Sequence, residues 1–134
     1  MKFTLYRGLP YIKVELHHNN QICNFERVLI DTGSAASVFS SDLLGEIGIT
    51  PNDDDKLHRI QGVGGYEYVI EKTIDLIYFD KAKIVDYPIQ LGELDYGQGI
   101  QAIIGSDILN HMNAVIDYKN QTLLFDVTVL GASS

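Results

Sequence analysis

The sequence predicts a mainly β fold with two short helices, and three observations support this. Apolar and polar residues alternate along several runs, which is typical of strands with one buried face. Turn signals such as 19–21 separate these runs. Only two stretches, within 40–49 and 101–113, carry the capping residues expected of helices.

The first element is a hairpin. Residues 11–18 alternate between apolar and polar, and residues 22–30 form a second β-rich run after the turn at 19–21. Two such runs joined by a short turn are expected to pair antiparallel. The second run ends in "VLI", which indicates a strand buried on both faces.

A short helix follows within 40–49. Ser40 or Ser41 is suited to its N-cap, and Gly48 to its end. The polar residues 50–56 read as a loop. The remaining elements are two strands within 57–79, a strand at 82–92 with Pro88 at an edge or a bulge, a strand and a capped helix within 101–113, and a last hairpin of 114–118 with 122–130.

Length and charge limit the possible functions. The 134 residues suit one domain, so we expect 1–134 to form a single unit. A formal charge of -8, with the lysines and arginines scattered along the chain, argues against a nucleic-acid binder. Cys23 is alone and cannot form an internal disulfide. No signal peptide or membrane-spanning segment is recognised, which predicts a cytoplasmic protein without a membrane partner.

The stretch "VLIDTGSAASVF" at 28–39 places an acid, Asp31, directly after an apolar strand. An aspartate at a strand end is commonly a turn residue. Here Gly33 permits a tight turn, and Thr32 and Ser34 add two hydroxyls. The apolar lead-in predicts a low-dielectric surrounding, which suits acid–base chemistry.

Three segments resemble motifs of one family. "IDTGSAAS" at 30–37 resembles the active-site signature of aspartic proteases, and "GVGGYEYV" at 62–69 resembles the tip of their flap hairpin. "AIIGSDIL" at 102–109 is similar to their second signature. Their order and spacing resemble the retropepsin-like branch over 28–125. The resemblance implies a retropepsin-like acid-protease closed barrel with two short helices, as a single retropepsin-like aspartic protease domain.

The resemblance also implies roles for individual residues. Asp31 would be the catalytic acid, and the residues after it would support it. The implied sets are Thr32, Gly33 and Ser34 for catalytic support, Gly62, Val63, Gly64, Gly65 and Tyr66 for the flap and substrate binding, and Ile103, Ile104, Gly105, Ser106 and Asp107 for the second signature. Tyr66 or Tyr68 would either cover the substrate or occupy a strand face.

Family chemistry needs two carboxylates that share a proton and activate water, with no metal or organic cofactor. No second Asp-Thr-Gly is present. Asp107 is expected to cap the second helix, and Asp117 to precede a turn. Asp75, Asp80 and Asp86 lack a supporting motif. The resemblance therefore implies a homodimer in which two copies of Asp31 meet on a twofold axis and act on a peptide or protein substrate.

The chain departs from the retroviral pattern at two positions. Retroviral members pair an acid two places after the motif glycine with an arginine after the second-signature glycine. Ala35 and Ser106 stand there instead. The dimer interface is therefore expected to differ, with the second helix and the strand 122–130 as candidates.

Other features leave alternatives open. The fold could serve as a catalytically weak or inactive module that binds peptides or a partner protein. The adjacent His17 and His18 point to opposite strand faces, and the acids of 52–55 lack the spacing of a calcium loop, so we expect no metal site. A weak echo between 28–39 and 102–112 predicts a pseudo-symmetric core.

Overall fold

The structure is a computed structural model that describes residues 1–62, 65–94 and 99–126, with backbone alone for 58–62 and 65–68. It confirms a mainly β fold with two short helices. The strands are β1 (Thr4–Tyr6), β2 (Leu9–His18), β3 (Gln21–Ile30), β4 (Val38–Ser40), β5 (Lys56–Gly62), β6 (Gly65–Phe79), β7 (Ala82–Gly92), β8 (Ala102–Ile104), β9 (Val115–Asp117) and β10 (Thr122–Leu124). The helices are α1 (Ser41–Glu46) and α2 (Ser106–His111).

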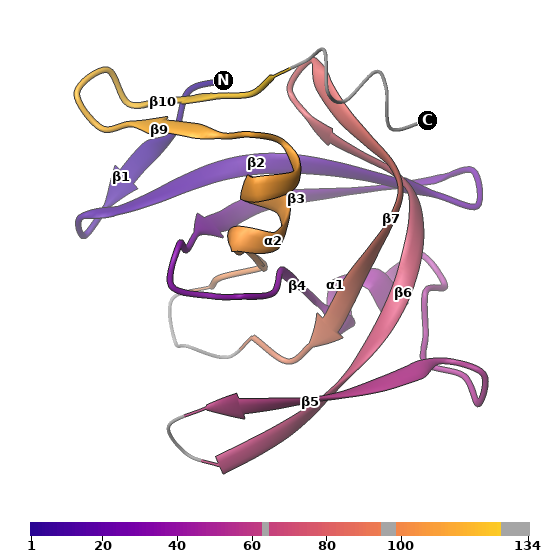
Figure 1. The fold of residues 1–134 in the computed structure, drawn as a ribbon. Helices are drawn as coiled ribbons and strands as arrows, with labels where there is room; N and C mark the ends of the chain where they lie inside the picture. Colours follow the sequence, from indigo (N-terminus) through magenta and orange to yellow (C-terminus); the bar gives the residue numbers. More distant parts are fainter. Residues whose placement is uncertain (63–64, 95–98, 127–134) are drawn as a thin grey trace.

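A closed barrel forms the body of the molecule (Figure 1). Its strands follow the order β2, β3, β8, β4, β7 and β6, and β6 pairs back to β2. β1 pairs with the start of β2, at 9–11, and β5 pairs with β6. The β5–β6 hairpin projects past the barrel. The barrel encloses an apolar core whose largest fully buried side chains include Phe25, Phe39 and Phe79.

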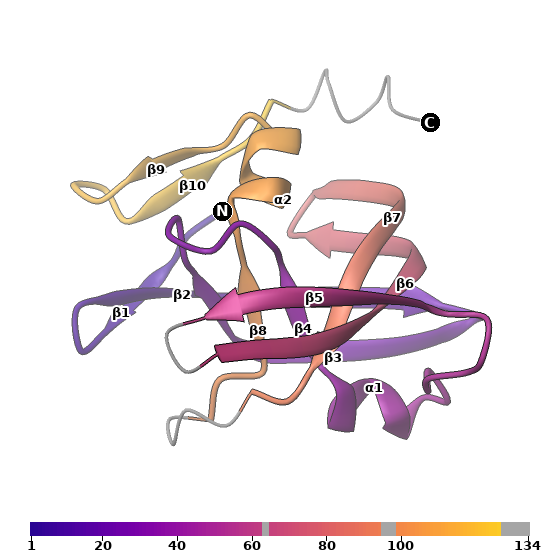
Figure 2. The same ribbon diagram turned by 60° about the horizontal axis from the view of Figure 1, so that its bottom comes forward.

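The strand pairing repeats itself with an approximate twofold relation. The antiparallel hairpin β2–β3 is followed by β4 and α1, and the hairpin β6–β7 is followed by β8 and α2. β3 pairs parallel to β8, β4 pairs parallel to β7, and β4 and β8 lie antiparallel between them. Figure 2 shows the two helices on opposite sides of the strands.

The sequence echo predicted this pseudo-symmetric core but aligned the wrong elements. It matched 102–112 to 28–39, whereas the topology makes β8 and α2 the counterparts of β4 and α1. The strand β3 corresponds instead to β7. The similar residues reflect a shared local pattern of apolar strand and small-residue turn.

Local signals in the N-terminal half are confirmed. Asn19 and Asn20 both have positive φ, 50° and 64°, as a two-residue hairpin turn requires. Ser40 caps α1, because its hydroxyl accepts a hydrogen bond from the Leu43 N–H at 3.4 Å. Gly48 follows the helix at φ +80°, a conformation that glycine adopts without strain.

Pro88 lies where the sequence predicted an edge. β7 pairs with β6 along most of its length, including Thr73 with Pro88. β4 contacts β7 only over 90–92. In the described chain, Pro88 therefore faces one neighbouring strand, and its missing N–H breaks no ladder on the other side.

The last hairpin is shorter than predicted. The second strand was expected to span 122–130, but β10 ends at Leu124. Phe125 packs edge-on against Phe79, with ring centroids 5.6 Å apart, and the Asp126 N–H donates to the Met112 carbonyl at 3.1 Å. These contacts draw the chain away from β9. The rest of the predicted strand, 127–130, lies outside the described residues.

Among the residues that the structure describes, no helix has the length and apolar character needed to cross a membrane.

Candidate active site

Asp31 stands at the end of β3, beside β8. Parallel pairing sets Leu29 opposite Ile103 and Ile30 opposite Ile104. The Asp31 N–H continues this ladder, donating to the Ile104 carbonyl at 2.9 Å. Asp31 therefore lies directly after the last residue of β3, at the end of a barrel strand.

The prediction of a dry surrounding for Asp31 is wrong for the single chain. Asp31 is only half-buried, and the neighbouring Thr32 and Gly33 are exposed. Within the described part of the chain, the Thr32 hydroxyl makes no hydrogen bond. The loop after β3 therefore presents the carboxylate and a free hydroxyl toward the outside.

The loop backbone holds the carboxylate in place. The Gly33 N–H donates to Asp31 Oδ1 at 3.0 Å, and the Ser34 N–H donates to the Asp31 carbonyl at 3.1 Å. A Cβ at Gly33 would lie 3.3 Å from Asp31 Oδ1, so glycine allows the close approach. The Ser34 hydroxyl donates to the Ala36 carbonyl at 2.7 Å, which closes the turn.

The second signature clamps this loop from the other side. The Ser106 N–H and hydroxyl both donate to the Ser34 carbonyl, at 2.8 and 3.1 Å. At Gly105 a Cβ would lie 2.6 Å from the Ser34 carbonyl oxygen and 2.7 Å from that of Ala36. Only glycine fits this approach, which explains the residue type at this position.

Asp107 does not cap α2, contrary to the sequence prediction. The helix begins at Ser106 with Gly105 as N-cap, and no side chain caps it. Asp107 Oδ1 instead accepts the hydroxyl of Ser37 at 2.7 Å. The same hydroxyl accepts the Gly105 N–H at 2.9 Å. The Asp107 carboxylate therefore bonds to Ser37 in the Asp31 loop and not to the N–H groups of its own helix.

Ser37 is the residue that sequence reasoning missed. It is 1% exposed, and it is the buried polar residue of the described core. Its hydroxyl joins the loop after β3 to the start of α2. A signal was present in the sequence, since Ser37 closes the "IDTGSAAS" motif, but nothing local indicated its partner 70 residues away.

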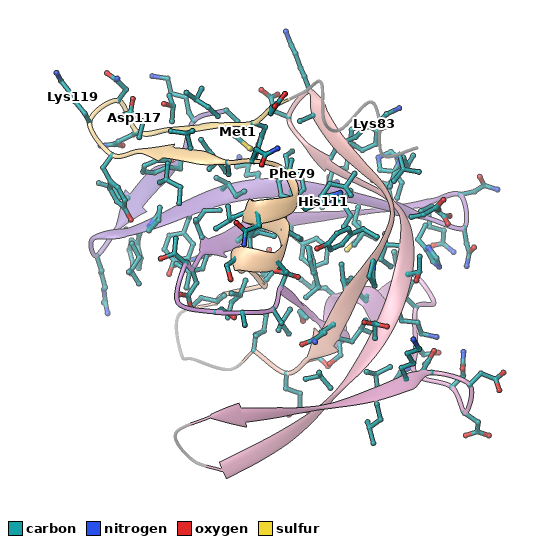
Figure 3. All side chains as sticks on the ribbon, in the orientation of Figure 1. Met1, Phe79, Lys83, His111, Asp117 and Lys119 are labelled. Carbon is teal, nitrogen blue, oxygen red and sulfur yellow. The ribbon has the colours of Figure 1, made fainter. Side chains whose placement is uncertain are left out.

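Asp107 also acts electrostatically on Tyr87, a β7 residue that packs against the main core. Burial, together with this carboxylate, raises the pKa of Tyr87 to about 12. The His111 ring lies tilted over Tyr87, with centroids 5.1 Å apart. Figure 3 shows His111 on α2, well separated from Asp117 on the β9–β10 hairpin.

Two of the other aspartates lie in strands and accept hydrogen bonds from hairpin turns. Asp75 Oδ2 accepts the Asn19 N–H at 3.0 Å, at the tip of β2–β3. Asp117 accepts the Asn120 N–H and side-chain amide, at 3.1 and 2.7 Å. The prediction that Asp117 precedes a turn is confirmed, and both acids have local structural partners.

An apolar cluster flanks Asp31 on the outer face of β3 and β8. Val28, Ile30 and Ile104 point into the main core, whereas Leu29 and Ile103 belong to a separate cluster. This cluster also contains Tyr11, Ile100 and Leu94. Because side chains alternate along a strand, Asp31 follows Leu29 to the same face.

The predicted flap corresponds to the tip of the β5–β6 hairpin. Gly62 pairs with Gly65, and Tyr66 pairs with Gln61. Val63 and Gly64 lie outside the described residues, as do the side chains of Tyr66 and Tyr68, so their roles stay predictions.

An ion pair fastens the base of this hairpin. Lys72 Nζ on β6 lies 2.9 Å from Asp55 Oδ1, just before β5, and both side chains are largely buried. The hydrogen bond from Lys72 lowers the pKa of Asp55 below its ordinary value.

The histidines of β2 pair with acids. His17 Nε2 lies 2.7 Å from Glu15 Oε2, and His18 Nδ1 lies 3.6 Å from Asp75 Oδ1. In the described ranges, no group of three or more His, Cys, Asp or Glu side chains is placed to hold a metal ion.

Comparisons with known proteins gave a family match and a similar fold. The sequence profile of the family described as "Aspartyl protease" matches residues 14–108. The fold is similar to the crystal structure of a retropepsin-like aspartic protease from Rickettsia conorii, with a TM-score of 0.63 and 18% identity, covering 89% of this chain and 83% of that one. A sequence search of curated proteins finds no match.

Proposed function

This chain belongs to the aspartyl protease family, and we propose that it is an endopeptidase whose active site combines the Asp31 carboxylates of two copies. The observation that carries the proposal is the loop after β3, where a half-buried acid is held by Gly33 and clamped by the second signature. In this proposal, residues 1–134 act as one protease domain.

A single chain holds only half of the machinery in this proposal. The sequence contains one Asp-Thr-Gly, and the hydroxyl of the exposed Thr32 has no hydrogen-bond partner among the described residues. In a symmetric dimer, each Thr32 would bond the loop of the partner subunit and each Asp31 would lose its exposure. Dimerisation would thereby supply the dry surrounding that the single chain lacks.

The proposed chemistry is the addition of water to a peptide carbonyl. Two adjacent carboxylates share one proton, because two negative charges placed side by side would repel each other. The ionised carboxylate accepts a proton from water while the water oxygen bonds to the carbonyl carbon. The protonated member donates to the carbonyl oxygen. When the tetrahedral intermediate collapses, the C–N bond breaks, the carboxyl that took its proton from water donates it to the leaving nitrogen, and the other carboxylate takes a hydroxyl proton from the intermediate. The Gly33 N–H would fix the acceptor oxygen during both steps.

The apolar cluster around Leu29 and Ile103 supports a preference for apolar residues at the scissile bond. It is separate from the main core and shares a strand face with Asp31. Burying one substrate side chain against such a surface contributes about 1.5–3 kcal/mol. The flap residues Gly62, Val63, Gly64, Gly65 and Tyr66 would cover the substrate from the other side.

The test is cleavage of an unstructured protein such as denatured casein, below neutral pH. Wild-type protein is expected to cleave it, and Asp31→Asn to lose cleavage with an unchanged circular dichroism spectrum. Retained activity in Asp31→Asn would overturn the assignment of the acid. Sedimentation should give a dimer, and a monomer at high concentration would remove the symmetric site. A folded dimer without activity on any substrate would favour the peptide-binding module.

A further inference from the structure

A β-bulge lies in β3 at Glu26 and Arg27, four to five residues before Asp31. Ile12 pairs with Val28 and Val14 pairs with Phe25, so two residues, Glu26 and Arg27, face the single residue Lys13. A bulge of this kind redirects the side chains at its position. Here Glu26 and Arg27 are both turned away from the core.

Gln101, just before β8, fixes the bulge. Its Oε1 accepts the N–H of Glu26 at 2.7 Å and that of Arg27 at 3.2 Å. Its own N–H donates to the Arg27 carbonyl at 2.9 Å. Gln101 therefore makes hydrogen bonds to three backbone groups of the bulge, and this fixed backbone sets the direction of the Arg27 side chain.

Two aromatic rings contact the Arg27 guanidinium. Its Cζ lies 4.8 Å from the ring centroid of Tyr6 and 5.3 Å from that of Tyr11. These are cation–π contacts, and within the described residues the guanidinium N–H groups donate no hydrogen bond. Arg27 forms no ion pair within the described residues, although the chain carries a formal charge of -8. An ordered fork of donors without an acid is suited to a carboxylate from another molecule.

The guanidinium lines a groove of about 850 Å³ on the outer face of β1, β2 and β3. Three other charged residues of the groove are already paired: Lys13 lies 3.3 Å from Glu26, and Glu15 pairs with His17. Arg27 and Lys2 form no ion pair among the described residues, and Asp80 also lines the groove.

Tyr11 connects this groove to the surroundings of Asp31. It lines the groove and also belongs to the apolar cluster that contains Leu29 and Ile103. Arg27 precedes Asp31 by four residues on one strand, about 13 Å at the rise of an extended chain. A bound peptide would cover this distance in about four residues.

We propose that Arg27 is a specificity-determining residue that binds the carboxylate of an acidic substrate residue about three to five positions from the scissile bond. This inference rests on the proposed function for its orientation of the peptide. In a dimer, each subunit would supply one such site, one on either side of the cleavage point.

The test uses fluorescein-labelled peptides with a central leucine pair, in which each outer position carries either glutamate or glutamine. Binding is measured by anisotropy to Asp31→Asn protein, so that no peptide is consumed. We expect the glutamate peptide to bind about tenfold tighter than its glutamine twin at one or two positions. Arg27→Gln should bring this ratio close to one and leave binding of the glutamine peptide unchanged.

Two further variants separate recognition from folding. Arg27→Lys keeps the charge without the planar fork and should retain a reduced preference. Lys13→Gln removes a cation from the same groove and should keep the full preference, since Lys13 is exposed and already paired. Urea midpoints of all variants provide the folding control.

The outcomes distinguish this inference from the proposed function. A glutamate preference that disappears with Arg27→Gln supports the inference even if the wild-type protein cleaves none of the peptides. A preference that survives Arg27→Gln, an equal loss in Lys13→Gln, or no preference at any position would overturn it.

Discussion

Ser37→Ala tests the link between the two signatures. The substitution removes one hydroxyl that donates to Asp107 Oδ1 at 2.7 Å and accepts the Gly105 N–H at 2.9 Å. The alanine is smaller than the serine by one oxygen atom and therefore fits the same space. The decrease in the free energy of unfolding therefore measures the contribution of these two hydrogen bonds.

The expected magnitude follows from burial. Ser37 is 1% exposed, so the Gly105 N–H is left without a partner in the core, which costs about 1–3 kcal/mol. Asp107 is partly exposed and regains water, so loss of its bond adds about 1 kcal/mol. The free energy of unfolding should fall by about 2–4 kcal/mol in total.

Ser106→Ala is the matched control. It removes a 3.1 Å hydrogen bond to the Ser34 carbonyl, but that carbonyl keeps the Ser106 N–H at 2.8 Å. The expected loss is about 1 kcal/mol or less. Both variants are unfolded in urea at equal protein concentration and followed by circular dichroism. Equal losses for the two variants would show that the buried Ser37 bridge has no special weight.

Two further predictions concern titration. The pKa of Asp55 is lowered from 3.8, first by the hydrogen bond from Lys72. Its ionised form therefore stabilises the fold above pH 3.8, and this contribution is lost as the pH falls through the lowered pKa. The difference in unfolding free energy between wild type and Asp55→Asn, measured in urea, should be largest near neutral pH and vanish in strong acid, and a difference that stays constant with pH would contradict this prediction. Tyr87, one of eight tyrosines, should ionise near pH 12, so its contribution is intact below pH 10 and lost as pH rises toward 12. Ultraviolet titration should lose this late step in Tyr87→Phe and only partly shift it in Asp107→Asn, because burial is the larger cause; an unchanged titration in Tyr87→Phe would refute the assignment.

Local parts of the fold could be predicted because their signals are local. Asn19 and Asn20 tolerate the positive φ of a hairpin turn, and Ser40 caps the helix that directly follows it. The loop at Asp31 was predicted as a site because a short motif carries it. Each of these features depends on residues within a few positions of one another.

Long-range partners explain the failures. Asp107 was predicted to cap α2 because acids in a first helical turn usually act on their own helix, yet Ser37 reaches it from 70 residues away. The bulge at Arg27 was missed for the same reason, since Gln101 fixes it from 74 residues away. No periodicity within either segment reveals such a partner.

A subunit-mixing experiment tests the shared active site most directly. Wild-type chains and Asp31→Asn chains are exchanged at equal amounts and fixed total concentration, and cleavage is followed with time. If each site needs one Asp31 from each of two chains, random pairing leaves about one quarter of the wild-type activity. If each chain works alone, about one half remains, and that result would contradict the account.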